Sequence, residues 1–247
     1  MRNRCIGSII AFVALLAIAP VMLAQTQKPS GAAADQAPAK VKAQTPDLSG
    51  VWIARSFPGT FTKAEPPMTP WGEEKYKANT SRPKAELDPD LKCFPPGPAR
   101  VYLHHYPFEI INTPGRVIML FEYDSIVRQI YTDGRGHPGA DDLSSPWMGH
   151  STGRWDGDTL VVDTIGMNDT TWLDEVGHPH SDALHLIERL RRVNQNTLQI
   201  DYTFDDPKAF TKAWTAQLNF ALRPGWDIGE HTCADNFLWK PLVGEGQ

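Results

Sequence analysis

The sequence has fewer basic than acidic residues and no stripe of Lys and Arg. Its 24 Lys and Arg are outnumbered by 29 Asp and Glu, which gives a formal net charge of -5. The one basic cluster, at residues 189–192, is offset by Glu188 and other nearby acids. Nucleic-acid-binding proteins neutralise phosphates with a basic stripe or patch. The charge pattern therefore argues against nucleic acid as a partner and disfavours phosphate ligands.

Long apolar runs are absent after the N-terminal segment. Residues 6–23 form a largely apolar run, preceded by Arg2 and Arg4 and followed by Ala24-Gln25. This order of basic, apolar and small residues predicts a signal peptide at residues 1–24, and a transmembrane anchor is the alternative. Cleavage would remove two positive charges and no acid, so the net charge would change from -5 to -7. We expect a periplasmic or secreted protein without a stable membrane anchor.

Cysteine is also scarce, with three residues in the chain. Cys5 precedes the apolar run, where no lipoprotein signal would place it, so we expect no lipid anchor. Cys93 and Cys233 remain after cleavage, and an exported chain meets an oxidising compartment. We predict a disulfide that joins the start of the domain to its end, with two buried free thiols as the alternative.

Large apolar side chains are nearly absent from residues 25–46, which are rich in Ala, Gln, Lys and Pro. Such a segment cannot bury enough surface to offset the entropy of ordering it. We predict a disordered linker there and a single domain over residues 47–247. The length of that domain suits one barrel or sandwich with a sizeable core.

Helical patterns are rare beyond the linker. Thr69 as a cap, Pro70 after it and acids in the first turn predict one short helix that ends before Pro83. The Pro- and Asp-rich residues 82–98 indicate a loop. The predicted strands are 47–52, 108–113, 117–121, 125–132, 151–155, 159–164, 183–192, 197–204, 214–222 and 228–233.

Turn sequences and side-chain alternation indicate how these strands are joined. Asp156-Gly157 is a strong two-residue hairpin signal, and Pro114-Gly115 suits a type II turn. Apolar residues alternate with polar ones over residues 198–204, so one face of that strand is expected to be exposed to solvent. Successive hairpins without alternating helices predict an all-β, mainly antiparallel barrel of lipocalin or calycin type, with a short N-terminal helix. A β-sandwich is the alternative.

Polar side chains that could take part in catalysis or ligand binding are concentrated between Asp133 and Glu188, a stretch that holds five of the eight histidines. One interpretation is a metal-free acid-base site with a histidine as proton carrier, a carboxylate that orients it and an arginine for a developing anion. A structural network of arginines and carboxylates is the other. The candidate catalytic residues are His150, Asp133, Arg154 and Asp163. The candidate ligand-binding residues are Arg135, Trp147, Trp172, His178, His180 and Glu188.

Two other kinds of catalytic site are less well supported. His178 and His180, with His185 or Glu188, have the residue types of a metal site, but Pro179 lies between the first two and no known metal motif matches. Residues 149–153 resemble a serine-hydrolase elbow only superficially, because they lead into a turn and a strand instead of a helix. We expect no metal and no cofactor.

The region around these residues also supports a family resemblance. Residues 147–164 carry the motif W-M-G-H-S-x-G-R-W-x-G-D-T-L-V-V-D-T. Together with residues 172–174, 178–182 and 206–208, this motif resembles an uncharacterised family of exported acidobacterial and proteobacterial proteins. The resemblance brings no catalytic assignment. More loosely, Gly50-Val51-Trp52 followed by hairpins is similar to the opening of lipocalin-like barrels, which implies a small hydrophobic ligand inside the barrel.

Three functional hypotheses follow from the sequence. The first is an exported barrel that binds a small organic ligand, which is hydrophobic, aromatic or sugar-like, at a barrel mouth. The second is a metal-free acid-base enzyme, namely a dehydratase, isomerase or hydrolase, that uses the same pocket. The third is a protein-interaction module of the cell envelope. The expected partner is a small molecule, and the oligomeric state stays open. The first hypothesis lines the mouth with His150, Arg154, Asp133, Arg135, His178 and His180.

Overall fold

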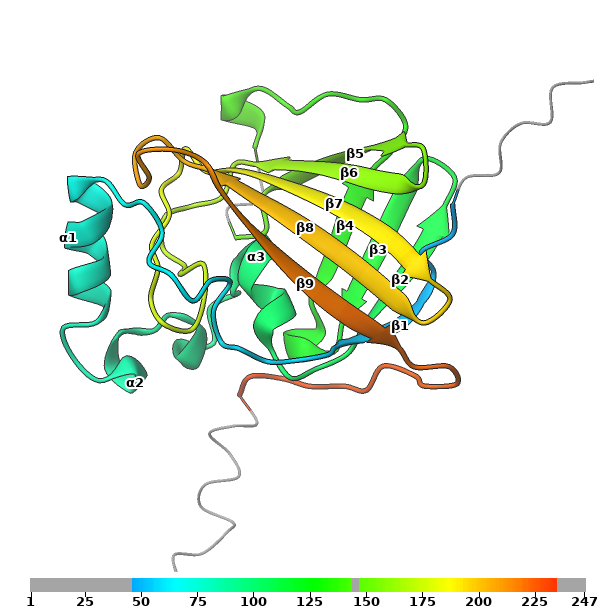
Figure 1. The fold of residues 1–247 in the computed structure, drawn as a ribbon, viewed down its shortest axis with the longest axis horizontal. Helices are drawn as coiled ribbons and strands as arrows, with labels where there is room; N and C mark the ends of the chain where they lie inside the picture. Colours follow the sequence, from blue (N-terminus) through cyan, green and yellow to red (C-terminus); the bar gives the residue numbers. More distant parts are fainter. Residues whose placement is uncertain (1–45, 144–146, 235–247) are drawn as a thin grey trace, which may run out of the picture. The chain divides into compact units, whose positions relative to one another are not determined.

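The computed structural model describes residues 46–143 and 147–234, and within them nine strands form one closed barrel (Figure 1). This confirms the predicted all-β barrel, and closure of the sheet excludes the sandwich alternative. The predicted signal peptide and nearly all of the predicted linker lie outside the described residues. The strands are β1 Gly50–Ala54, β2 Phe108–Thr113, β3 Arg116–Phe121, β4 Val127–Tyr131, β5 His150–Asp156, β6 Thr159–Ile165, β7 His185–Asn194, β8 Thr197–Asp205 and β9 Trp214–Leu222.

Strands that follow one another in the sequence are neighbours in the barrel, and β1 closes it by pairing with β9. Every pair is antiparallel except β4 and β5, which run parallel and share only the pairs Ile130↔Ser151 and Tyr131↔Thr152. A parallel pair needs a long crossover, which residues 132–149 supply. We call this short β4–β5 joint the parallel seam.

One predicted strand does not form, and another is shifted. Residues 228–233 make no ladder, because β1 takes the edge of β9 that this segment would need. The segment is held instead by side chains, with the Gly229 amide donating to Glu122 Oε2 at 2.8 Å. The first strand begins at Gly50 and not at Asp47, because the Asp47 carboxylate accepts from the Ser49 amide at 2.8 Å.

Short helices connect the barrel strands, most of them between β1 and β2. The predicted helix is confirmed as α1, Pro70–Asn79, and the Thr69 side chain accepts from the Gly72 amide at 3.1 Å. Two helices of one turn follow it, and one of them lies within the predicted loop at residues 82–98. The remaining helical segments are α2 Lys84–Leu87, α3 Gly97–Arg100 and the 3-10 turns Asp90–Lys92, Val101–Leu103, Tyr123–Ser125 and Ala140–Asp142.

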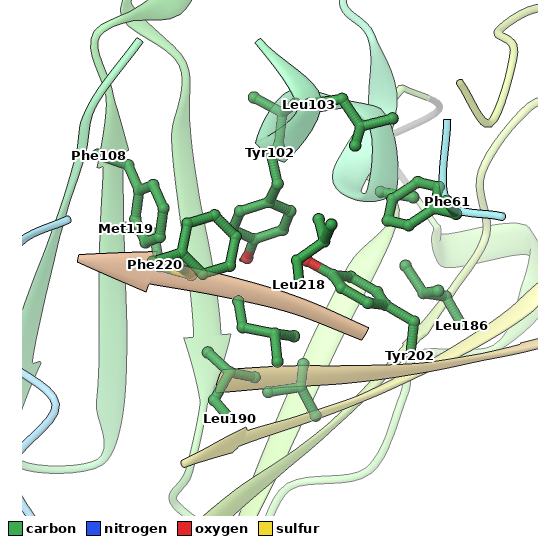
Figure 2. Close-up of a cluster of buried hydrophobic side chains, with 14 of the residues drawn as sticks. Phe61, Tyr102, Leu103, Phe108, Met119, Leu186, Leu190, Tyr202, Leu218 and Phe220 are labelled. Atoms are coloured by element: carbon green, nitrogen blue, oxygen red, sulfur yellow. Dashed lines mark hydrogen bonds between the residues drawn. The ribbon is translucent and has the colours of Figure 1, made fainter. Parts of the chain in front are cut away.

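Large side chains fill the barrel interior (Figure 2). Tyr102, carried in by the 3-10 turn after α3, packs edge-on against Phe108, with ring centroids 5.3 Å apart. Phe220 from β9 and Tyr202 from β8 lie around the same ring, at 5.8 Å and 6.0 Å. The place that a lipocalin-type ligand would take is therefore occupied by the protein's own aromatic residues.

One buried ion pair lies among these apolar side chains. Arg128 of β4 and Glu188 of β7 are 2% and 0% exposed, and the Arg128 guanidinium donates to both Glu188 oxygens. The same guanidinium donates to Ser151 Oγ of β5 at 3.2 Å, to Thr164 Oγ1 of β6 at 2.9 Å and to the Tyr102 hydroxyl at 3.0 Å. This interior network thus links four adjacent strands across the parallel seam.

The predicted disulfide between Cys93 and Cys233 is confirmed, with the two Cα atoms 5.4 Å apart and a sequence separation of 140. A second buried polar cluster adjoins it. Arg100 of α3 donates to both oxygens of Asp88, at 2.7 Å and 2.6 Å. These contacts anchor the irregular segment between β1 and β2.

His104 belongs to this cluster and stacks on Tyr123, with ring centroids 3.7 Å apart. Burial lowers the pKa of His104 to about 3, and the positive charge of Arg100 adds to that effect. The Asp90 carboxylate lies 3.5 Å from His104 Nε2 but does not overcome these two causes. His104 is therefore neutral in the folded protein at all but strongly acidic pH.

We predict a loss of stability in mild acid that traces to His104. Below pH 6.5 an unfolded chain protonates this side chain, whereas the folded protein does not until about pH 3, so the free energy of unfolding falls across that interval. Between pH 7 and pH 5 the loss is about 2 kcal/mol. His104→Phe should remove this part of the slope in urea titrations. The exposed neighbour variant His105→Gln should retain it, and equal slopes in both variants would contradict the prediction.

Candidate functional site

Strand alternation places three of the predicted catalytic residues together on the outer wall of the barrel. On β5, Ser151 points inward, so His150 and Arg154 point outward, and Asp163 points outward from the adjacent strand β6. Thr152 pairs directly with Asp163, and Arg154 pairs with Val161. These side chains therefore lie on the outside of the β5–β6 hairpin, not in the barrel mouth that the sequence analysis predicted.

Two further histidines complete a chain of polar contacts on this wall. His150 Nδ1 lies 2.9 Å from His137 Nδ1, and His137 Nε2 lies 3.4 Å from Asp163 Oδ1. The same Asp163 oxygen lies 2.6 Å from His185 Nε2 at the start of β7. We call His150, His137, Asp163 and His185 the His–Asp chain.

One set of protons satisfies the hydrogen bonds of the His–Asp chain. If His185 Nε2–H donates to Asp163 Oδ1 and His137 Nε2–H donates to Thr152 Oγ1 at 3.3 Å, His137 keeps a lone pair on Nδ1, which accepts from His150 Nδ1–H. Burial lowers the pKa of His150, as do the neighbouring His137 and Arg135, so this ring is neutral near neutral pH. His150 Nε2 and His185 Nδ1 then remain as free proton acceptors.

Asp133 and Arg135 adjoin this chain. Arg135 Nε donates to Asp133 Oδ1 at 2.9 Å, and this hydrogen bond lowers the pKa of Asp133. The Arg135 guanidinium lies 4.1 Å from the centre of the Tyr131 ring, which in turn stacks on His150 at 5.4 Å. Asp133 is thus ionised and held by Arg135, and Arg135 reaches His150 through Tyr131.

An open groove of about 490 Å³ runs along the same wall, and we call it the outer groove. The apolar Val161 and Ile187 line it together with charged side chains from β5, β6 and β7. Two of its arginines are paired, Arg135 with Asp133 and Arg189 with Asp156 at 3.0 Å. The third arginine of the groove, Arg154, forms no ion pair with any described residue. The lining residues are Gly134, Arg135, Thr152, Gly153, Arg154, Val161, Asp163, Ile187 and Arg189.

A smaller cleft of about 230 Å³ lies over the parallel seam. His150 and Tyr131 line it, and the buried Arg128 and Ser151 form part of its wall. His150 therefore faces the seam cleft, while Asp163, two contacts further along the His–Asp chain, faces the outer groove. The His–Asp chain therefore connects the outer groove with the cleft over the parallel seam.

The structure does not bring His178 and His180 to the His–Asp chain. Both are buried in the loop between β6 and β7, where His178 Nδ1 lies 2.6 Å from Asp174 Oδ2. Burial lowers the pKa of His178, but the Asp174 hydrogen bond outweighs it, so the net shift is upward. His180 Nε2 lies 2.7 Å from Thr171 Oγ1, and burial lowers its pKa. In these positions both rings hold the loop together.

The other three candidate ligand-binding residues also lie elsewhere. Trp172 is buried beneath the guanidinium of Arg100, which lies 5.8 Å from its ring centre. Trp147 stacks on Phe94 beside the disulfide, with centroids 5.3 Å apart. Glu188 belongs to the interior network with Arg128. The predicted set is thus divided between the outer wall, the loops and the interior.

Three further findings concern metal sites, membrane-spanning helices and similar proteins. Within residues 46–143 and 147–234, no group of three or more His, Cys, Asp and Glu side chains is arranged to hold a metal ion. The described helices include none that is long and apolar enough to cross a membrane. Comparison of the chain with family models, with curated proteins and with solved structures gave no match.

Proposed function

We propose that this protein is an exported barrel that binds a small organic ligand in the outer groove. One observation carries the proposal: Arg154, without an ion-pair partner among the described residues, shares a groove with Asp163 of the His–Asp chain. The interior is filled by aromatic side chains, so the groove takes the place of a lipocalin-type cavity. Its volume and its mixture of an apolar floor with a few polar groups are typical of small-molecule sites.

The proposal of export rests on two features that agree. The basic, apolar and small order of residues 1–24 is that of a signal peptide. The Cys93–Cys233 disulfide suits an oxidising compartment, because disulfides are rare where thiols are kept reduced. We therefore place the protein in the periplasm or outside the cell, as the resemblance to an exported family also implies.

The groove can be tested by filling it. Ile187→Trp adds a bulky side chain to the groove floor, and Ile118→Trp makes the same change on the outer face of β3, outside the groove. We expect native mass spectrometry of protein from its source to show a co-purified small molecule in the wild type and in Ile118→Trp. The molecule should be absent from Ile187→Trp, although both variants melt as the wild type does. A ligand retained equally by both variants would contradict binding in the groove.

The His–Asp chain favours a second function, that of a metal-free acid-base enzyme such as a dehydratase, isomerase or hydrolase. A carboxylate that holds one nitrogen of a histidine leaves the other poised to accept a proton, as His185 is held at 2.6 Å by Asp163. In this function, a substrate in the groove gives its proton to His185, which precedes Ile187 of the groove lining on the outer face of β7, and Arg154 stabilises the anion that develops.

Substitution of Asp163 separates catalysis from simple binding. If the protein is an enzyme, Asp163→Asn should lower kcat for the identified ligand about 10²- to 10⁴-fold. Asp201→Asn is the matched control, since its carboxylate lies on the outer face of β8 and, among the described residues, accepts from Gln199 and Gln217 alone. The measurement is conversion of the ligand followed by NMR. No conversion by the wild type, with binding intact, would leave the binding function and remove the enzymatic one.

A further inference from the structure

We infer that the ligand of the outer groove is a small hydroxylated organic acid, about one six-membered ring in length. Its carboxylate is held by Arg154 and its hydroxyl by Asp163. This inference rests on the proposed function and adds to it the chemical class of the ligand.

The carboxylate is assigned from the arginines of the groove. Arg135 and Arg189 already hold Asp133 and Asp156, so their charges are compensated. Arg154 has no such partner in the part of the chain that the structure describes. A guanidinium offers two parallel N–H groups that match a carboxylate, which makes arginine the usual partner of such anions. Among the described residues that line the groove, Arg154 is therefore the cation left to bind an anionic group.

The hydroxyl is assigned from the other end of the groove. Asp163 uses one oxygen, Oδ1, for both His185 and His137, and its Oδ2 accepts from no described residue. Asp163 is 42% exposed and lines the groove, so this second oxygen is open to a ligand. A carboxylate repels a second carboxylate and accepts from a hydroxyl. The ligand therefore points its acid group towards Arg154 and its hydroxyl towards Asp163.

The length of the ligand follows from strand register. Arg154 pairs with Val161 and Thr152 pairs with Asp163, so Arg154 and Asp163 occupy diagonal positions on the antiparallel pair. The Cα atoms of such diagonal neighbours lie about 7–8 Å apart. Val161 lies opposite Arg154 on β6, Ile187 lies opposite Asp163 on β7, and both present apolar surface to the groove. An acid group and a hydroxyl on opposite sides of one ring fit this spacing, and the face of the ring covers the apolar floor.

Two kinds of molecule share this chemistry, a hydroxylated aromatic acid and a sugar acid, and the test separates them. The full-length mature protein is titrated calorimetrically, at fixed ionic strength, with 4-hydroxybenzoate and with glucuronate. The uncharged analogues 4-hydroxybenzamide and glucose are the controls for charge. We expect at least one acid to bind, and its neutral analogue to bind about tenfold more weakly or not at all.

The variants assign the effect to single side chains. Arg154→Gln should reduce the affinity for the acid to that for its neutral analogue. Lys212→Gln removes the same charge from the exposed β8–β9 loop, outside the groove lining, and should bind like the wild type. Asp163→Asn should reduce the advantage of 4-hydroxybenzoate over benzoate, or of glucuronate over its analogue without the opposing hydroxyl.

Failure of this inference can be distinguished from failure of the proposed function. Neutral analogues that bind as tightly as the acids, or an Arg154→Gln variant that binds the acid like the wild type, would overturn the acid assignment. So would the absence of binding by either acid while other ligands are still lost in Ile187→Trp. Ligands that bind Ile187→Trp as well as the wild type would instead overturn the groove itself.

Discussion

Replacement of Glu188 by glutamine is expected to lower the free energy of unfolding by about 3–5 kcal/mol, because it leaves a buried charge without its partner. Burial lowers the pKa of Arg128, but the Glu188 carboxylate outweighs that effect and raises it above the usual value. Arg128 therefore keeps its proton, and in the variant it faces an uncharged amide. The loss also weakens the link between four strands at the parallel seam, where β4 and β5 share only two residue pairs.

Two controls distinguish the buried charge from a general effect of the substitution. Arg128→Met combined with Glu188→Leu removes both charges, and this double variant should be more stable than either single variant. Asp156→Asn breaks an exposed pair with Arg189 and should cost no more than about 1 kcal/mol. Urea unfolding measures all of these values. A Glu188→Gln variant no less stable than Asp156→Asn would show that the ion pair does not hold the seam.

Removal of the disulfide is expected to cost about 2–5 kcal/mol. The Cys93–Cys233 bond closes a loop with a sequence separation of 140 residues, and a long loop restricts the unfolded chain strongly. The bond also ties the segment after β9 to the cluster of Arg100, Asp88 and Tyr123. The variant Cys93→Ser/Cys233→Ser should therefore unfold at a lower urea concentration.

Reduction of the wild-type protein gives an independent measurement of the same quantity. Under dithiothreitol its urea midpoint should fall to that of the double serine variant, whose own midpoint should not move. Denatured, unreduced mature protein should show no free thiol on alkylation. Two free thiols, or a midpoint that reduction leaves unchanged, would contradict a stabilising disulfide.

The barrel was predictable because its local signals agree with its topology. Asp156-Gly157 and Pro114-Gly115 both join strands as predicted, and the alternation in residues 198–204 matches the buried and half-exposed positions of β8. Residues 228–233 carry strand-like residues but no ladder, since only the long-range pairing of β1 with β9 decides which segment takes that edge. The parallel seam has no local signal, because it depends on the path of residues 132–149.

The candidate site was predictable where its residues share one hairpin. His150, Arg154 and Asp163 project from β5 and β6 at positions that alternation and the Asp156-Gly157 turn bring to one face. His137 and His185 were not assigned to the site, because a loop and the register of a third strand place them there. For Glu188 a usable signal existed: Leu186 and Leu190, two residues on either side, are both fully buried and mark the inward face of β7.

The most direct test of ligand binding on the outer wall is a screen of small organic acids against ¹⁵N-labelled mature protein, followed by amide chemical shifts. Binding in the outer groove predicts saturable shifts at Thr152, Arg154, Asp163 and Ile187, and their loss in Ile187→Trp. Shifts that gather instead at inward-facing residues such as Ile200 and Leu218 would place the ligand inside the barrel and contradict the groove.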